Sequence, residues 1–264
     1  MASRDEILRT AEELHVEIRA TEEWQDSYKQ SEDTFRALLE LEAMMQTAMG
    51  EYLLELGTRA AGYVDWTRLP QPISADSGPV FNNDDPAWAR EEQLLTAAVL
   101  DIIVSLIATG ALAGEFIYEI PAGFSTLDEA VLEAARLHVA TFVKGATVTT
   151  RKLIREAVAQ SISLGEDATL AKQRLFKIIN NPVRAELIAQ TEPVNAYQTG
   201  YKLYAKATGA KKKTWDGLAG ACALCTPLIG KTIDIDDLFM MSNGVEIDRP
   251  AAHPRCRCSL IYVY

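Results

Sequence analysis

The sequence predicts a mainly α-helical protein with a small C-terminal α+β module. Apolar residues recur at helical spacing through most of the chain up to Gly209, and the following segments are short and rich in β-branched and aromatic residues. All four cysteines lie in this last part, at positions 222, 225, 256 and 258. The expected architecture is therefore a helical body followed by a short β-containing module that is stapled by cysteine and histidine.

The composition is that of an ordinary globular protein. Charged residues make up 24% of the 264 residues and hydrophobic residues 48%, so the chain can bury a core without disulfide staples. Lys and Arg number 26 against 37 Asp and Glu, a formal charge of −11, which makes the chain a poor candidate for coating DNA. Residues 1–14 are charged throughout, so no secretory signal is expected.

The N-terminal part predicts two helical segments and a connection. Apolar residues between Ile7 and Ile18 recur at helical spacing, and residues 31–56 carry a second apolar stripe. This second stripe favours an intramolecular helical hairpin, with a docking surface for another protein as the alternative. Four prolines within residues 64–86 indicate a long connection.

An apolar helix is expected over residues 87–112. The overlapping segment 94–114 is long enough to span a membrane, but Asp101 lies in its middle and Arg90 is the only basic residue at its flanks. A buried core helix is the better interpretation, and no membrane contact is expected.

Two helices are expected after a turn at residues 119–125. Thr126 and Glu129 match a capping box, which predicts a helix over residues 127–143. A separate helix is expected over residues 149–164, with Gly165 as its C-terminal stop.

The next part of the chain predicts two more helical segments. Asp167 is expected to cap a helix that Asn180, Asn181 and Pro182 end. Pro193 lies inside the following helical tract, residues 183–208, and should kink it or restart it with Thr191 as N-cap. Strands are then expected in residues 228–235 and 259–264.

The C-terminal module carries the one constellation with a chemical signal. Cys222 and Cys225 form a C-x2-C pair, which places two thiolates at a separation suited to one tetrahedral zinc ion. His253, Cys256 and Cys258 follow after a long spacer and complete a set of five candidate ligands. The second pair is C-x-C, which departs from zinc-ribbon spacing. One structural zinc is the hypothesis we carry forward, because the ligand count leaves no open position for catalysis.

Three alternatives to zinc stay open at this point. The thiols can be reduced and buried, can form a disulfide between the two halves, or can carry out redox chemistry. No G-x-S-x-G, P-loop or H-E-x-x-H motif occurs elsewhere in the sequence, so we expect no enzyme and no further cofactor.

Basic residues near the module are candidates for contact with a partner or a phosphate. They are Lys211, Lys212, Lys213, Arg255 and Arg257. For the two arginines, intramolecular pairing with the acidic run at residues 233–237 is preferred.

The second half of the chain resembles the phage Mu protein F-like family of minor head proteins, also called head morphogenesis proteins. The resemblance begins with the helix–turn–helix tract from residue 149 and continues with a Thr-Glu helix containing Thr191, Glu192 and Gly200, although Gln190 stands where the family usually has Arg. It ends with the pattern formed by Trp215, Cys222, Cys225, Gly230, Lys231, His253, Pro254, Cys256, Arg257 and Cys258. The LAGA segment before Cys222 departs from the family's usual Asp-containing approach.

The resemblance implies a structural component of the virion, not an enzyme. Such a protein is expected inside the phage head near the portal, in contact with the portal protein or the inner capsid surface, and close to packaged DNA. It would aid head assembly, DNA packaging or ejection, and would pass through the host cytoplasm during assembly.

The expected organisation has three parts, and two other function classes are kept as alternatives. Residues 1–86 would form an N-terminal helical arm and linker, residues 87–148 a central helical region, and residues 149–264 the Mu F-like domain. The alternatives are a zinc-dependent or thiol-redox enzyme and a nucleic-acid-binding module.

Overall fold

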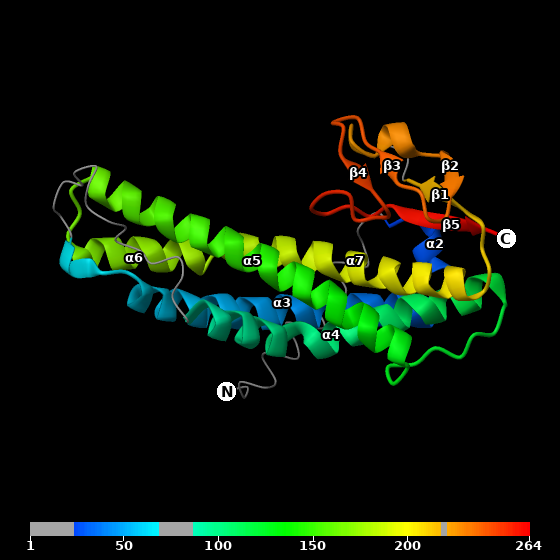
Figure 1. Ribbon diagram of the computed structural model, residues 1–264, viewed down its shortest axis with the longest axis horizontal. Helices are drawn as coiled ribbons and strands as arrows, with labels where there is room; N and C mark the ends of the chain where they lie inside the picture. The colour runs from blue at the N-terminus through cyan, green and yellow to red at the C-terminus, as the bar shows by residue number, and fades with distance from the viewer. Residues whose placement is uncertain (1–23, 69–86, 218–220) are drawn as a thin grey trace, which may run out of the picture. The chain divides into compact units, whose positions relative to one another are not determined.

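A computed structural model describes residues 24–68, 87–217 and 221–264 of the chain (Figure 1). The predicted helix between Ile7 and Ile18 lies outside the described residues, as does most of the predicted connection. The described chain is mainly helical and ends in short strands, which confirms the predicted fold class.

The helices are long, and their bounds agree with most of the sequence-based expectations. They are α2 (Asp26–Lys29), α3 (Glu32–Ala60), α4 (Ala87–Tyr118), α5 (Glu129–Ser163), α6 (Ala168–Ile179) and α7 (Pro182–Ala207), with short 3₁₀ turns at Ala61–Tyr63, Trp66–Arg68 and Thr226–Leu228. α4 meets the length and hydropathy criteria of a membrane span, with a mean hydropathy of 2.1, but 56% of its most apolar window is buried inside the structure. The core helix of a folded domain meets the same criteria, so they do not identify a membrane span.

Helix ends follow the expected capping chemistry in α6 but not in α5. Asp167 accepts hydrogen bonds from the backbone N–H groups of Thr169 and Leu170, which confirms it as the N-cap of α6. Gly165 adopts a φ of 65° just after α5, as predicted for a stop. The predicted capping box of Thr126 is wrong. α5 begins at Glu129, two residues after the predicted start, and the Asp128 carboxylate accepts a hydrogen bond from the Ala130 N–H at 2.9 Å.

Two predicted breaks are absent from the helices. Residues 129–163 form one helix, α5, where two had been predicted, because the glycine at 145 costs too little to end a helix whose neighbours favour it. α7 continues through Pro193, and Thr191 is not an N-cap: its hydroxyl donates to the Leu187 carbonyl inside the helix.

The strands form a three-stranded antiparallel sheet and a separate hairpin. β1 (Lys212–Asp216) lies at the centre, between β2 (Thr232–Asp234) and β5 (Ser259–Val263), and β3 (Phe239–Met240) pairs with β4 (Glu246–Ile247). β2 and β5 confirm the two predicted strand regions, whereas the central strand β1 was not predicted from strand propensity. Trp215 of β1 is fully buried and packs edge-on against Phe239.

The described chain divides into two compact units. One contains residues 24–46, 100–138 and 187–264 apart from 218–220, and the other contains residues 47–68, 87–99 and 139–186. In the second unit the buried Glu91 accepts hydrogen bonds from Tyr52, Tyr63 and Arg59, at 2.6 Å from the Arg59 Nε and the Tyr63 hydroxyl. In the first unit the strands lie beside α2 and the C-terminal half of α7 (Figure 1).

Glycines allow a very close approach between α4 and α7 in the first unit. A Cβ added to Gly110 would lie 1.9 Å from the Tyr197 carbonyl oxygen, and one added to Gly200 would lie 1.8 Å from the Ile107 carbonyl oxygen. Each helix thus presents a bare backbone position to the carbonyl of the other. The family-matching Gly200 is required by packing, because any side chain there would separate the two helices.

We predict that Gly110→Ala and Gly200→Ala each lower the free energy of unfolding by about 1–3 kcal/mol, the usual cost of overpacking a close contact. Urea unfolding followed by circular dichroism measures the change. Gly145→Ala is the matched control, because a Cβ at Gly145 meets nothing within 4 Å. This substitution should raise stability by about 0.5–1 kcal/mol through helix propensity. Equal effects at all three positions would contradict the packing argument.

Candidate metal centre

The first two candidate ligands lie in a tight turn after β1. The Cys222 carbonyl accepts hydrogen bonds from the N–H groups of Cys225 at 3.0 Å and Thr226 at 2.9 Å, which folds the C-x2-C segment back on itself. Cys225 is fully buried and Cys222 is exposed. The turn therefore brings both thiols to the same side.

The other three candidate ligands lie in the segment that leads into β5. The Cys256 N–H donates to the His253 carbonyl at 3.1 Å, and Arg255 adopts a φ of 63° within this turn. The Arg255 N–H lies 3.4 Å from the Thr191 Oγ1, which attaches the turn to α7. Cys256 and Cys258 are both buried.

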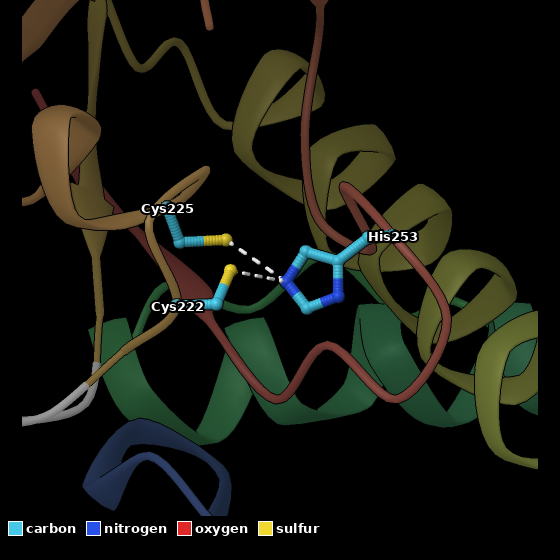
Figure 2. A group of neighbouring side chains, drawn as sticks. All are labelled: Cys222, Cys225 and His253. Atoms are coloured by element: carbon cyan, nitrogen blue, oxygen red, sulfur yellow. Dashed lines mark hydrogen bonds between the residues drawn. The ribbon is translucent and has the colours of Figure 1, made fainter. Parts of the chain in front are cut away.

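The five side chains form two overlapping groups that share Cys225. Cys222, Cys225 and His253 make up one group, and Cys225, Cys256 and Cys258 the other, with donor atoms within 4.8 Å of one another in each group. The His253 Nε2 lies 3.0 Å from the Cys222 Sγ and 3.3 Å from the Cys225 Sγ (Figure 2). The structure thus brings all five sequence-predicted ligands together.

The donor separations are close to those of a tetrahedral site. With Zn–S bonds of about 2.3 Å and Zn–N bonds of about 2.0 Å, neighbouring donors lie roughly 3.5–3.8 Å apart. The His253 Nε2 lies 3.0 Å from the Cys222 Sγ and 3.3 Å from the Cys225 Sγ, both below this range, and the Cys225 and Cys256 sulphurs lie 3.9 Å apart, just above it. All four cysteines are free thiols in the structure. The Cys/His cluster can therefore hold a metal ion.

The ring of His253 is oriented as a metal ligand requires. Its Nδ1 lies 2.8 Å from the Pro254 carbonyl oxygen, which can accept only from a protonated Nδ1. A neutral ring then carries its lone pair on Nε2, the atom that faces the thiols in Figure 2. Such an outer hydrogen bond fixes the tautomer of many metal-binding histidines.

The pKa values of the cluster residues are shifted by the protons that these residues share. Hydrogen bonding from Cys225, with Cys258 adding to it, lowers the pKa of the Cys256 thiol well below its usual value. Its hydrogen bond to Cys256 in turn raises the pKa of Cys225, because two adjacent buried thiolates repel. Hydrogen bonding to Cys256 raises the pKa of His253 to about 9. A metal cation would replace the shared protons and stabilise several thiolates at once.

Backbone N–H groups stabilise the thiolate form of Cys222. Partial burial alone would raise the pKa of this thiol. Hydrogen bonds from the N–H groups of Cys225 and Leu224 outweigh burial and lower the pKa. The turn therefore stabilises the thiolate, which is the form that binds metal.

Arg257 lies between two cluster cysteines, but its side chain points away from the sulphurs. Its guanidinium pairs with the Glu42 carboxylate at 2.9 Å and donates to the Gln190 carbonyl at 2.6 Å. It also lies 4.0 Å from the centre of the Trp24 ring. The preferred pairing of Arg257 with the acidic run is therefore wrong, because the side chain is buried against α3 and cannot reach it.

The candidate contact lysines separate into exposed and buried residues. Lys211 and Lys212 are exposed, and Lys212 lies 3.5 Å from Asp234. Lys213 is completely buried, and its Nζ lies 2.5 Å from the Asp248 carboxylate and 2.9 Å from the Asp248 carbonyl. Lys213 and Arg257 therefore have structural partners inside the fold. Contact with a partner or a phosphate stays a prediction for the exposed Lys211, Lys212 and Arg255.

Two residues of the Thr-Glu helix have clear structural roles. The Glu192 carboxylate lies 3.0 Å from the His138 Nε2, and both side chains are largely buried. Thr191 accepts the N–H of Arg255 and so links α7 to the His253–Cys258 segment. In the described structure these residues stabilise contacts between elements.

Sequence reasoning missed the residues that support the cluster from outside. Glu42 lies on the apolar stripe of α3, between Leu38 and Met45, and an acidic residue in such a position indicates a buried cationic partner. Tyr28 and Gln198 carry no such signal. Their role follows only from the fold, which brings them to Cys258 and Ser259.

Residues 152–261 match the family model described as phage Mu protein F like protein. This region is similar to the phage Mu protein F-like family. The match contains every candidate ligand of the metal centre and covers somewhat less than half of the chain. Searches of curated proteins and of solved structures gave no match.

The family connects the chain with phage head morphogenesis, as the motifs predicted. The matched range agrees closely with the resemblance expected from residue 149 onwards. The predicted division at residues 86 and 148 stays a prediction, and so do the roles of the individual ligands.

We predict that Asp248→Asn lowers stability on the order of 2 kcal/mol at pH 7. Burial alone would raise the pKa of Asp248, but hydrogen bonds from Lys202 and Lys213 outweigh it and lower the pKa to about 2. A depressed pKa contributes stability above the unfolded value, and this contribution is lost as the pH falls through the folded value. The difference between the two proteins should therefore shrink between about pH 4 and pH 2.

Urea unfolding at several pH values tests this expectation. Asp237→Asn is the control, because Asp237 is an exposed carboxylate on the same module. A stability difference for Asp248→Asn that does not change with pH would contradict the ion-pair explanation.

Proposed function

We propose that this chain is a structural minor head protein of a phage, located inside the head near the portal. The match of residues 152–261 to the Mu F-like family carries the proposal. A structural role is supported by Gly200, Arg257 and Glu192, because each of these residues contacts another element of the fold.

The proposed partners are the portal protein or the inner capsid surface, with packaged DNA close by. The net charge of −11 opposes adhesion to the phosphate backbone. Three lysines in and near the module pair with carboxylates within the fold: Lys206 with Asp236, and Lys202 and Lys213 with Asp248. The protein would therefore lie beside DNA without holding it tightly.

Virion composition tests the head role directly. We expect the protein in purified procapsids and virions, in few copies per particle, by quantitative mass spectrometry. Imaging of the portal region in intact heads, compared with heads that lack the protein, should show density on the inner side. Absence from both particle types would contradict the proposal. Tight DNA binding at low ionic strength would instead support the nucleic-acid-binding alternative.

Zinc is the ion we propose for the Cys/His cluster. Four thiols and one imidazole are the soft and borderline donors that zinc prefers, and the described cluster offers five donors for four positions. When bound, zinc would supply a rigid cross-link between the turn at Cys222–Cys225 and the segment at His253–Cys258. It would leave no vacant position for catalysis, which fits a structural site.

We predict one zinc ion per chain and a large loss of zinc affinity in Cys225→Ser. Cys225 belongs to both donor groups, so its removal breaks both, whereas Cys222→Ser removes one exposed donor of five. Metal analysis, thiol titration and thermal unfolding with and without a chelator measure these effects.

Metal analysis with thiol titration also distinguishes a structural zinc site from a thiol-redox enzyme. One tightly held zinc with four unreactive thiols supports the structural site. A reactive thiol pair that cycles with a reductant, and no bound metal, would support redox chemistry instead.

A further inference from the structure

The Cys256–Cys258 segment has two differently occupied sides. The sulphurs of Cys256 and Cys258 face Cys225 in the cluster, while the side chain of Arg257 leaves the segment in the other direction. Glu42, near the middle of α3, receives the guanidinium at 2.9 Å. The same three residues therefore carry two ligands of the metal centre and one half of a buried ion pair.

The N-terminal part of the described chain holds this segment at a second point. The Tyr28 hydroxyl donates to the Cys258 carbonyl at 2.7 Å and accepts from the Gln198 Nε2 at 2.8 Å. Gln198 also donates to the Ser259 Oγ at 3.0 Å. Tyr28 is fully buried and packs against Trp24, whose ring lies under the Arg257 guanidinium.

We propose that Glu42 and Tyr28 are positioning residues of the metal centre. Neither donates an atom to the five-ligand set, yet each fixes the backbone from which Cys256 and Cys258 project. Metal coordination tolerates only small displacements of its donors, and outer partners of this kind commonly change metal affinity about 10- to 100-fold. Residues 24–42 are thus part of the metal centre, more than 200 positions before its last ligands.

Zinc binding and the docking of residues 24–42 should strengthen each other. A segment held by Glu42 and Tyr28 presents a preformed pair of thiolates, so it binds the ion more tightly. By linkage, a bound ion must favour docking of residues 24–42 by the same factor. Metal binding to the cluster is therefore expected to stabilise the docked position of residues 24–42, which contribute no ligand. The inference rests on the proposed zinc site and goes beyond it.

The test measures zinc affinity of the full chain by competition with a chromophoric chelator. We expect Glu42→Gln and Tyr28→Phe to weaken zinc binding by about tenfold or more. Glu42→Gln removes the negative charge opposite Arg257, and Tyr28→Phe removes the hydroxyl with its hydrogen bonds to Cys258 and Gln198, while both nearly keep the side-chain volume. Glu40→Gln, an exposed carboxylate on the same helix, is the matched control and should bind zinc as the natural protein does. Ile103→Val in α4 controls for a general loss of stability, because α4 contributes no ligand.

Hydrogen exchange supplies a second readout that does not depend on affinity. Zinc should slow exchange of the amides of residues 24–42 in the natural protein, and this protection should be reduced in Tyr28→Phe, which keeps its ring in the core. Unchanged zinc affinity and unchanged protection in folded Glu42→Gln and Tyr28→Phe would overturn the positioning role and leave the zinc site standing. A natural protein that binds no zinc would overturn the zinc assignment and this inference together, while leaving the head role to be decided by virion composition.

Discussion

The buried pair of Arg257 and Glu42 is the interaction on which the C-terminal module depends. The two side chains are 6% and 0% exposed, so both charges have left water. Removing one partner from such a pair costs about 3–5 kcal/mol, because the other charge stays buried without compensation. The guanidinium therefore has one low-energy position, against Glu42, Trp24 and the Gln190 carbonyl. The backbone that presents the two neighbouring cysteines is fixed with it.

The close contact between α4 and α7 is a second constraint, because it positions α7 beside the Arg257–Glu42 pair. The mutual contacts of Gly110 and Gly200 bring the α4 and α7 backbones together without side chains between them. α7 then presents Gln190 to Arg257 and Gln198 to Tyr28. Ile103, Leu106 and Ile107 of α4 are fully buried inside the first unit beside this contact. Small residues within an apolar helix, which dilute a membrane span, here permit a close helix–helix contact.

Local chemistry decided which parts could be predicted from the sequence. The cap at Asp167, the stop at Gly165 and the five ligands all depend on residues close in sequence or on a distinctive residue type. The two unbroken helices were missed because tertiary packing overrides weak local signals such as a mid-helix glycine. β1 could not be predicted from strand propensity, because lysines have a low propensity for strands; in the structure Lys213 is buried in an ion pair with Asp248. Glu42 could be flagged by its apolar neighbours, but its partner lies 215 positions away and only the fold identifies it.

Charge balance connects the metal centre with the rest of the module. Buried Lys213 is compensated by Asp248, and buried Arg257 is compensated by Glu42. Among the buried thiols, Cys225 is contacted by the imidazole of His253, whose Nε2 lies 3.3 Å from the Cys225 Sγ. Several thiolates in such a place are costly unless a cation accompanies them. A divalent ion would supply that charge and a tetrahedral geometry together, whereas protons can compensate the thiols only one at a time. A cation in the Cys/His cluster would thus compensate its thiolates in the way that Asp248 and Glu42 compensate the buried Lys213 and Arg257.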